Sequence, residues 1–161
     1  MTLDQLESTL PNGLHDAELT RIIVDYERRQ MSFELAVWVG DIDAPPDRRE
    51  AYRNGRVDIS GLLFLVIEPP DPKYPFKSSD LTIDGCDTRM NLNSELLDSV
   101  PPDAFFRSFW VNQWNAFIHV AAKDAQMSWM NEASLTYRTS KELKAKSQKP
   151  SSRNHVILAA E

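Results

Sequence analysis

The residues of this chain with the most reactive side chains are three histidines and one cysteine. His15, His119 and His155 lie far apart and lack the H-x-H or H-E-x-x-H spacing of a zinc site built from neighbouring ligands. Cys86 has no partner cysteine, and the acidic residues around it disfavour the reactive thiolate. Motifs for phosphate loops, dinucleotide binding and serine nucleophiles are missing as well. We therefore predict no catalytic residue, no metal site built from neighbouring residues and no cofactor, although residues that only folding brings together could still form a site.

Asp41, Asp43 and Asp47 give one loop an acidic start. Their spacing faintly resembles that of a calcium-binding loop, whose ligands alternate along the chain. Pro45 and Pro46, however, occupy the part of such a loop where ligands and a turn glycine are required. This pattern favours a solvated acidic loop over a calcium site.

Apolar and polar residues alternate in the segments around these residues, as they do in β-strands. Apolar side chains occupy every second position from Met31 to Val39, which predicts a strand with one buried face. The apolar run within 18–25 and the polar break at 26–30 predict a hairpin with that strand. The segment 56–68 is the most hydrophobic strand candidate, and the continuous apolar run 62–67 predicts a central strand covered on both faces.

The remaining segments add further strands and short helices. The aromatic stretch 105–114 fits both helical and strand spacing, and its aromatic content favours a strand that ends in a turn. The other expected elements are a capped helix at 2–10, helical turns within 47–53 and 91–100, a weaker strand at 81–90, a hairpin of 117–122 with 126–137, a helix at 140–147 and a last strand at 155–160. The sum predicts an α+β, mainly β fold: an antiparallel twisted sheet or half-barrel of six to eight strands with two or three short helices. The length of 161 residues suits one domain spanning 1–161.

This expected topology brings several polar residues together. If the first three strands form a meander, the start of the first strand and the loop after the second lie at the same end of the sheet. His15, Asp16, Asp41, Asp43 and Asp47 would then converge on one patch. Such a patch could bind a cation or the basic surface of a partner, although a solvated charged rim has the same composition.

Charge is distributed unevenly along the chain. The formal net charge is -6, which argues against a general nucleic-acid-binding protein. Residues 1–137 contain 12 basic and 22 acidic residues, whereas 138–153 contain six basic residues and one acidic residue. We expect 138–154 to form a basic helix and linker before the last strand, which either lies against the acidic body or binds an anionic partner.

The chain carries no sign of export or membrane insertion. No apolar run reaches the ~18 residues of a membrane span, and the N-terminus lacks the basic start and apolar core of an export signal. A single cysteine fits a reducing compartment. The sequence therefore predicts a cytoplasmic protein, of bacterial type, that does not bind membranes.

Two short motifs are distinctive: L-H-D-A ahead of the first strand, and W-N-A-F-I towards the end of the sheet. The residues concerned are Leu14, His15, Asp16, Ala17, Trp114, Asn115 and Ile118. Together the motifs resemble small uncharacterised bacterial proteins with an LHDA start and a WN[AS]FI stretch, some of which are similar to immunity proteins of contact-dependent toxin systems. The resemblance implies a protein that binds a partner, and it supplies no catalytic motif.

Two functional classes remain open. The first is a non-catalytic protein-binding domain, immunity-like, whose acidic body would attract a partner with a basic surface. The second is a small-molecule or cation binder, or a hydrolase, with a site assembled at the sheet end near His15 and Asp41. We favour the first class. An open sheet also allows a homodimer through an edge strand.

Overall fold

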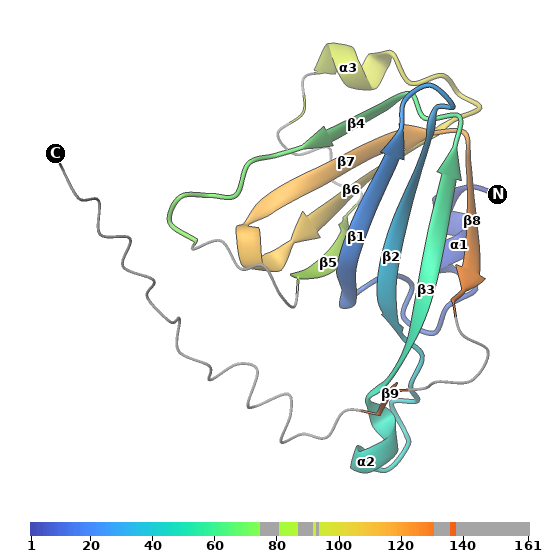
Figure 1. The fold of residues 1–161 in the computed structure, drawn as a ribbon, viewed down its shortest axis with the longest axis vertical. Coiled ribbons are helices and arrows are strands. Elements are labelled where there is room, and N and C mark those ends of the chain that lie inside the picture. The colour runs from blue at the N-terminus through green and yellow to red at the C-terminus, as the bar shows by residue number, and fades with distance from the viewer. Residues whose placement is uncertain (75–80, 87–91, 93, 131–135, 138–161) are drawn as a thin grey trace, which may run out of the picture.

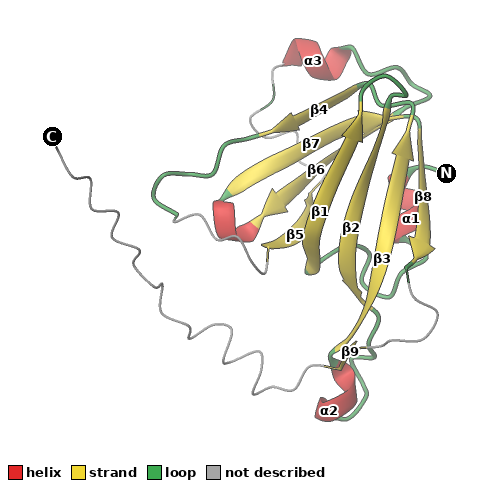
Figure 2. Cartoon of the chain, viewed as in Figure 1, coloured by secondary structure: helices red, strands yellow, loops and turns green. Residues whose placement is uncertain are grey.

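Strands dominate the computed structural model, which describes residues 1–74, 81–86, 92, 94–130 and 136–137 (Figures 1 and 2). The strands are β1 (Ala17–Asp25), β2 (Gln30–Trp38), β3 (Ala51–Ser60), β4 (Phe64–Ile67), β5 (Leu81–Cys86), β6 (Phe105–Val111), β7 (Ala116–Ala122), β8 (Asp124–Trp129) and β9 (Thr136–Tyr137). Their order is β4-β7-β6-β5-β1-β2-β3-β8, every pairing is antiparallel, and β9 pairs with the start of β3. The basic helix and linker expected at 138–154 and the strand expected at 155–160 lie outside the described residues.

Within the described residues, three short helices and one 3-10 turn accompany the sheet. They are α1 (Leu3–Glu7), α2 (Pro46–Arg49), α3 (Ser94–Asp98) and η1 (Asn112–Trp114). A capping box opens α1: the Thr2 hydroxyl accepts from the Gln5 amide, and the Gln5 side chain accepts from the Thr2 amide. None of the described helices is long and apolar enough to cross a membrane. The prediction of a mainly β, antiparallel sheet with two or three short helices is confirmed.

The first three strands form the predicted meander. The alternation that begins at Met31 places the apolar side chains of β2 on the buried face, while β1 and β3 pair with its two edges. β3 begins at Ala51, five residues before the expected start, because Tyr52 pairs with Trp38 and prolongs the ladder with β2. The ambiguous stretch 105–114 is strand β6 followed by the turn η1, as its aromatic content favours.

Each of the two edge strands, β4 and β8, follows in the chain a strand that lies near the opposite end of the sheet order. β4 follows β3 after three residues that begin with Gly61, and β8 follows β7 after Lys123 alone (Figure 1). Backbone hydrogen bonds join the two bends, because the Lys123 amide donates to the Ser60 carbonyl at 3.2 Å and the Leu63 amide to the Ala121 carbonyl at 2.8 Å. The sheet therefore turns a corner here. The Lys123 ammonium also donates to Asp103 at 2.8 Å and lowers the pKa of that exposed carboxyl.

This corner corrects two expectations. Residues 117–122 and 124–129 do not form a hairpin: the chain bends at Lys123, and β7 pairs with β4 and β6 while β8 pairs with β3. β4 is an edge strand of the sheet order and not a central one. Its apolar residues are still used on both faces: Leu65 packs against the core, and the Phe64 ring lies 6.2 Å from that of Phe106 on the opposite face.

The bent sheet encloses one apolar interior. Phe33 of β2 and Phe109 of β6 come from different halves of the sheet, and their buried rings meet edge to face with centroids 5.5 Å apart. Leu3 and Leu6 of α1 belong to the same core cluster, so the helix covers the open side of the sheet. Arg107 of β6 holds the helix in place through ion pairs with two acidic residues of α1, Asp4 and Glu7.

We predict that Gly61→Ala destabilises the protein more than Gly13→Ala. Gly61 has a φ of +64° and Gly13 a φ of +55°, so each alanine adopts a left-handed backbone at a cost of about 1–2 kcal/mol. A Cβ at Gly61 would in addition lie 2.9 Å from Lys123 Cβ, whereas a Cβ at Gly13 would lie at an ordinary 3.5 Å from Glu7 Cβ. Urea unfolding should give the larger loss of unfolding free energy for Gly61→Ala, and equal losses would contradict the tight corner.

Candidate functional site

The chain enters β1 through a tight turn that carries the L-H-D-A motif. The Ala17 amide donates to the Leu14 carbonyl at 3.1 Å, and the side chains of both residues are fully buried, which fixes the turn to the core. His15 and Asp16 lie between these two anchors, with side chains that are 56% and 60% exposed. Asp16 has a φ of +58°, a conformation that Asp adopts more readily than most residues. The motif thus consists of two inward anchors and two outward polar groups.

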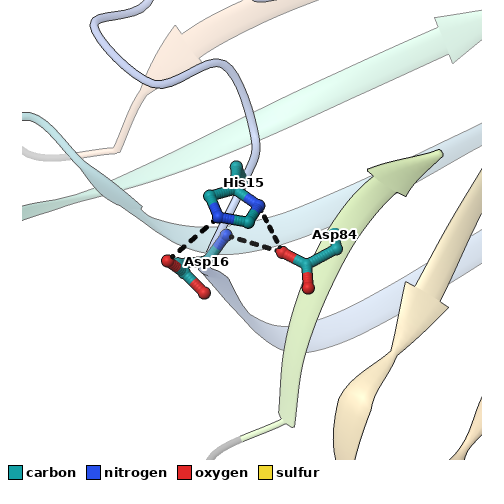
Figure 3. A group of neighbouring side chains, drawn as sticks. All are labelled: His15, Asp16 and Asp84. Carbon is teal, nitrogen blue, oxygen red and sulfur yellow. Dashed lines mark hydrogen bonds and ion pairs between the residues drawn. The ribbon is translucent and has the colours of Figure 1, made fainter.

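Asp84 of β5 meets these two outward groups and completes a three-residue cluster (Figure 3). His15 Nδ1 lies 2.6 Å from Asp84 Oδ1, and His15 Nε2 lies 3.4 Å from Asp16 Oδ2. The Asp16 backbone amide also donates to Asp84 Oδ1 at 3.3 Å. The three ligand atoms all lie within 4.8 Å of one another.

The imidazole of His15 cannot satisfy both carboxylates as a neutral ring. A neutral imidazole has one N–H, so it donates at one nitrogen and presents a lone pair at the other. The short contact to Asp84, which is the less exposed of the two carboxylates, assigns that proton to Nδ1. Nε2 then directs its lone pair towards Asp16, and the two carboxylates favour a positive group there: a metal ion or a basic side chain.

The other predicted site residues lie in the connection between β2 and β3. Asp41 and Asp43 follow β2 and are exposed, and the Asp41 carboxylate accepts from the Asp43 amide at 2.9 Å. Asp47 lies in α2, and its side chain is outside the described part of the structure. Among the described residues, the metal-ligating cluster brings together His15 and Asp16, and neither Asp41 nor Asp43 belongs to it.

Sequence reasoning missed Asp84 because its place depends on a pairing between distant strands. β5 and β1 are joined by three residue pairs, the first of which is Ala17 with Ile83. Asp84 therefore stands beside the residue that precedes β1. The only sequence signal was a short polar interruption, Asp84-Gly85, in an otherwise apolar strand candidate.

Aromatic side chains lie next to the cluster on the outward face of the sheet. Asp84 pairs with Trp110 of β6, and Trp110 pairs with Phe117 of β7. Directly paired residues project from the same face of a sheet. We call this set, Asp84, Trp110 and Phe117, the outer row. Trp110 and Phe117 are both half-buried, so the row combines a carboxylate with accessible ring surface.

A polar hollow of about 340 Å³ lies elsewhere, over β2, β3 and β8. Ser32, Arg56 and Asp58 line it and bond to one another: Arg56 donates to Asp58 at 2.7 Å and to the Ser32 hydroxyl at 2.8 Å, and that hydroxyl donates to Asp58 at 2.8 Å. Since these groups already satisfy each other, the hollow is a weaker candidate than the cluster at His15.

A second histidine network is buried under the aromatic rings of the same face. His119 of β7 is fully buried; its Nδ1 lies 2.8 Å from the Ser108 hydroxyl and its Nε2 lies 3.2 Å from Glu68 Oε1. Glu68 is acceptor only when ionised, which assigns the ring proton to Nε2 and leaves Nδ1 to accept from Ser108. The rings of Phe106 and Phe117 stack on the imidazole at 6.2 and 5.6 Å.

This Ser-His-Glu arrangement resembles a catalytic triad in composition but not in access. A nucleophilic serine must reach its substrate, and the Ser108 side chain is fully buried. Ser108 and His119 are also a directly opposed cross-strand pair of β6 and β7. The network therefore acts in the packing of these strands, where it satisfies polar groups that burial would otherwise leave unpaired.

We predict that Ser108→Ala lowers the free energy of unfolding by about 1–3 kcal/mol, because it leaves His119 Nδ1 without a donor in a dry environment. Ser128→Ala on the exposed face of β8 is the matched control, and we expect a change within about 0.5 kcal/mol. Chemical unfolding monitored by tryptophan fluorescence measures both. A Ser108→Ala protein as stable as the control would contradict a network that contributes to packing.

No protein-family model, no curated protein and no solved structure matches this chain. A function must therefore be argued from the geometry of the cluster and its surroundings. These comprise an oriented imidazole, two carboxylates and a row of accessible aromatic rings.

Proposed function

We propose that this domain binds a partner protein that presents basic side chains, and that the partner docks on the His15–Asp16–Asp84 cluster and the outer row. The observation that carries the proposal is the pairing of Asp84 with Trp110, which sets negative charge beside accessible aromatic surface on one face. Binding surfaces are enriched in aromatic residues, and Trp is among the residues that most often dominate binding energy.

The charges of the domain support a basic partner. The cluster holds two carboxylates against one imidazole, and residues 1–137 as a whole contain 22 acidic and 12 basic residues. A field of one sign accelerates the encounter with a partner of opposite sign and disfavours partners of like sign. The exposed carboxylate of Asp16 would then pair with a lysine or arginine of the partner at the edge of the interface.

An immunity-like role is consistent with how the two motifs are used. In the L-H-D-A motif, Leu14 and Ala17 are buried, and only His15 and Asp16 can touch another molecule. The later motif is mainly structural: Asn115 takes a left-handed conformation with a φ of +47° to end the turn η1. The exposed pair, together with Phe117 of the later motif, which belongs to the outer row, is therefore the part of the resemblance that would contact a toxin-like partner.

The proposal predicts that the acidic cluster determines partner binding. Tagged full-length protein is used as bait in a lysate of the organism that encodes it, next to Asp16→Asn/Asp84→Asn and the control Glu27→Gln. Glu27 is an exposed acid in the turn at the opposite end of β1. We expect a basic protein in one-to-one ratio with the wild-type and control baits, and its loss from the double variant.

The purified pair then gives the quantitative test. Titration calorimetry should show binding that weakens as salt rises, and about tenfold weaker binding for the double variant, equivalent to ~1.4 kcal/mol. Glu27→Gln should bind within about twofold of wild type, as a distant surface charge does. An identical set of proteins on wild-type and double-variant baits, or a captured partner that is acidic, would contradict the proposal.

A further inference from the structure

His15 is held so that one of its ring nitrogens remains available to a ligand. Nδ1 donates to Asp84 Oδ1 at 2.6 Å, and Nε2 faces the Asp16 carboxylate without reaching normal hydrogen-bond distance, since 3.4 Å exceeds the ~2.7–3.2 Å of an N–H···O bond. We propose that His15 Nε2 and Asp16 Oδ2 together bind a divalent transition-metal ion of the zinc class, with Asp84 as the carboxylate that orients the histidine.

The separation of the two ligand atoms fits a tetrahedral metal ion. Zinc binds histidine nitrogen and carboxylate oxygen at about 2.0–2.2 Å, so two such ligands of one tetrahedral ion lie roughly 3.3–3.5 Å apart. The observed distance between His15 Nε2 and Asp16 Oδ2 is 3.4 Å. The contact of 2.6 Å between His15 Nδ1 and Asp84 is too short to share an ion in this way, which leaves Asp84 as a hydrogen-bond acceptor.

The carboxylate behind the histidine is the usual companion of a metal ligand. Histidines that bind metals almost always donate their other N–H to a carboxylate, carbonyl or water, which fixes the tautomer and the ring orientation. Asp84 accepts from the His15 ring and from the Asp16 backbone amide, so a single carboxylate positions both proposed ligands. The three side chains converge in the same way in Figure 3.

The ligand types select the class of metal. An imidazole nitrogen beside a carboxylate suits zinc and neighbouring transition metals, whereas calcium and magnesium prefer sites of oxygen atoms only. The exposure of both side chains leaves the remaining coordination positions to water. Both ligands belong to this chain, so the metal site needs no partner, and a bound ion would compete with a basic side chain of the proposed partner for the Asp16 carboxylate.

Titration calorimetry with zinc chloride on the full chain tests the proposal. We expect saturable one-to-one binding, its loss in His15→Gln, and about 10- to 100-fold weaker binding in Asp84→Asn, the usual effect of removing an orienting carboxylate. Cys86→Ser/His155→Gln is the control, because these two residues are the other cysteine and histidine of the sequence besides the buried His119. This control should bind as wild type does.

Two results would overturn the inference: no heat of binding at millimolar zinc, or binding that survives His15→Gln. Because His15 is exposed, His15→Gln should unfold at the same urea concentration as wild type, which shows that any loss of binding is local. Repeating the partner titration in the presence of EDTA separates this inference from the proposed function. Partner binding that persists in EDTA shows that the partner does not need the metal ion. The zinc titration alone then tests the metal site.

Discussion

The short ladder between β1 and β5 is the constraint on which both the fold and the site depend. β1, β2 and β3 form a meander, and β5, β6 and β7 form the other half of the sheet, whose strands are joined to the first half by three residue pairs between β1 and β5. Ala17 and Ile83 face each other in this ladder, and both are buried in the core. Just beyond its end, the Asp16 amide donates to Asp84.

A ladder of three pairs would be weak alone, and the rest of the fold supports it. The corner at Gly61 and Lys123 brings the two halves face to face, so that Phe33 and Phe109 meet in the interior. Once the interior is filled, a shift of β5 against β1 by one residue would move the apolar side chains of that strand to the outward face. The packed core therefore holds Asp84 opposite His15, and the precision of the exposed cluster comes from buried residues.

Local patterns in the sequence predicted most of the strands, because the formation of a single strand depends on the alternation of neighbouring residues. The alternation from Met31 onwards and the capping box at Thr2 both appear in the structure as expected. The errors concern long-range pairing: the apolar run at 62–67 does not reveal that β4 is an edge strand, and Lys123 does not reveal that β7 and β8 pair with different strands. The same limit applies to the site. His15 and Asp16 are neighbours in sequence, whereas Asp84 reaches them through a ladder between residues more than sixty positions apart.

The most direct measurement is the protonation state of the two His15 ring nitrogens in the full chain, read by ¹H–¹⁵N correlation at alkaline pH. If Asp84 accepts from the ring as the structure shows, Nδ1 carries the proton, Nε2 is unprotonated, and this preference is lost in Asp84→Asn. A proton on Nε2, or the same tautomer mixture in wild type and Asp84→Asn, would contradict an account in which the β1–β5 ladder orients His15 for binding.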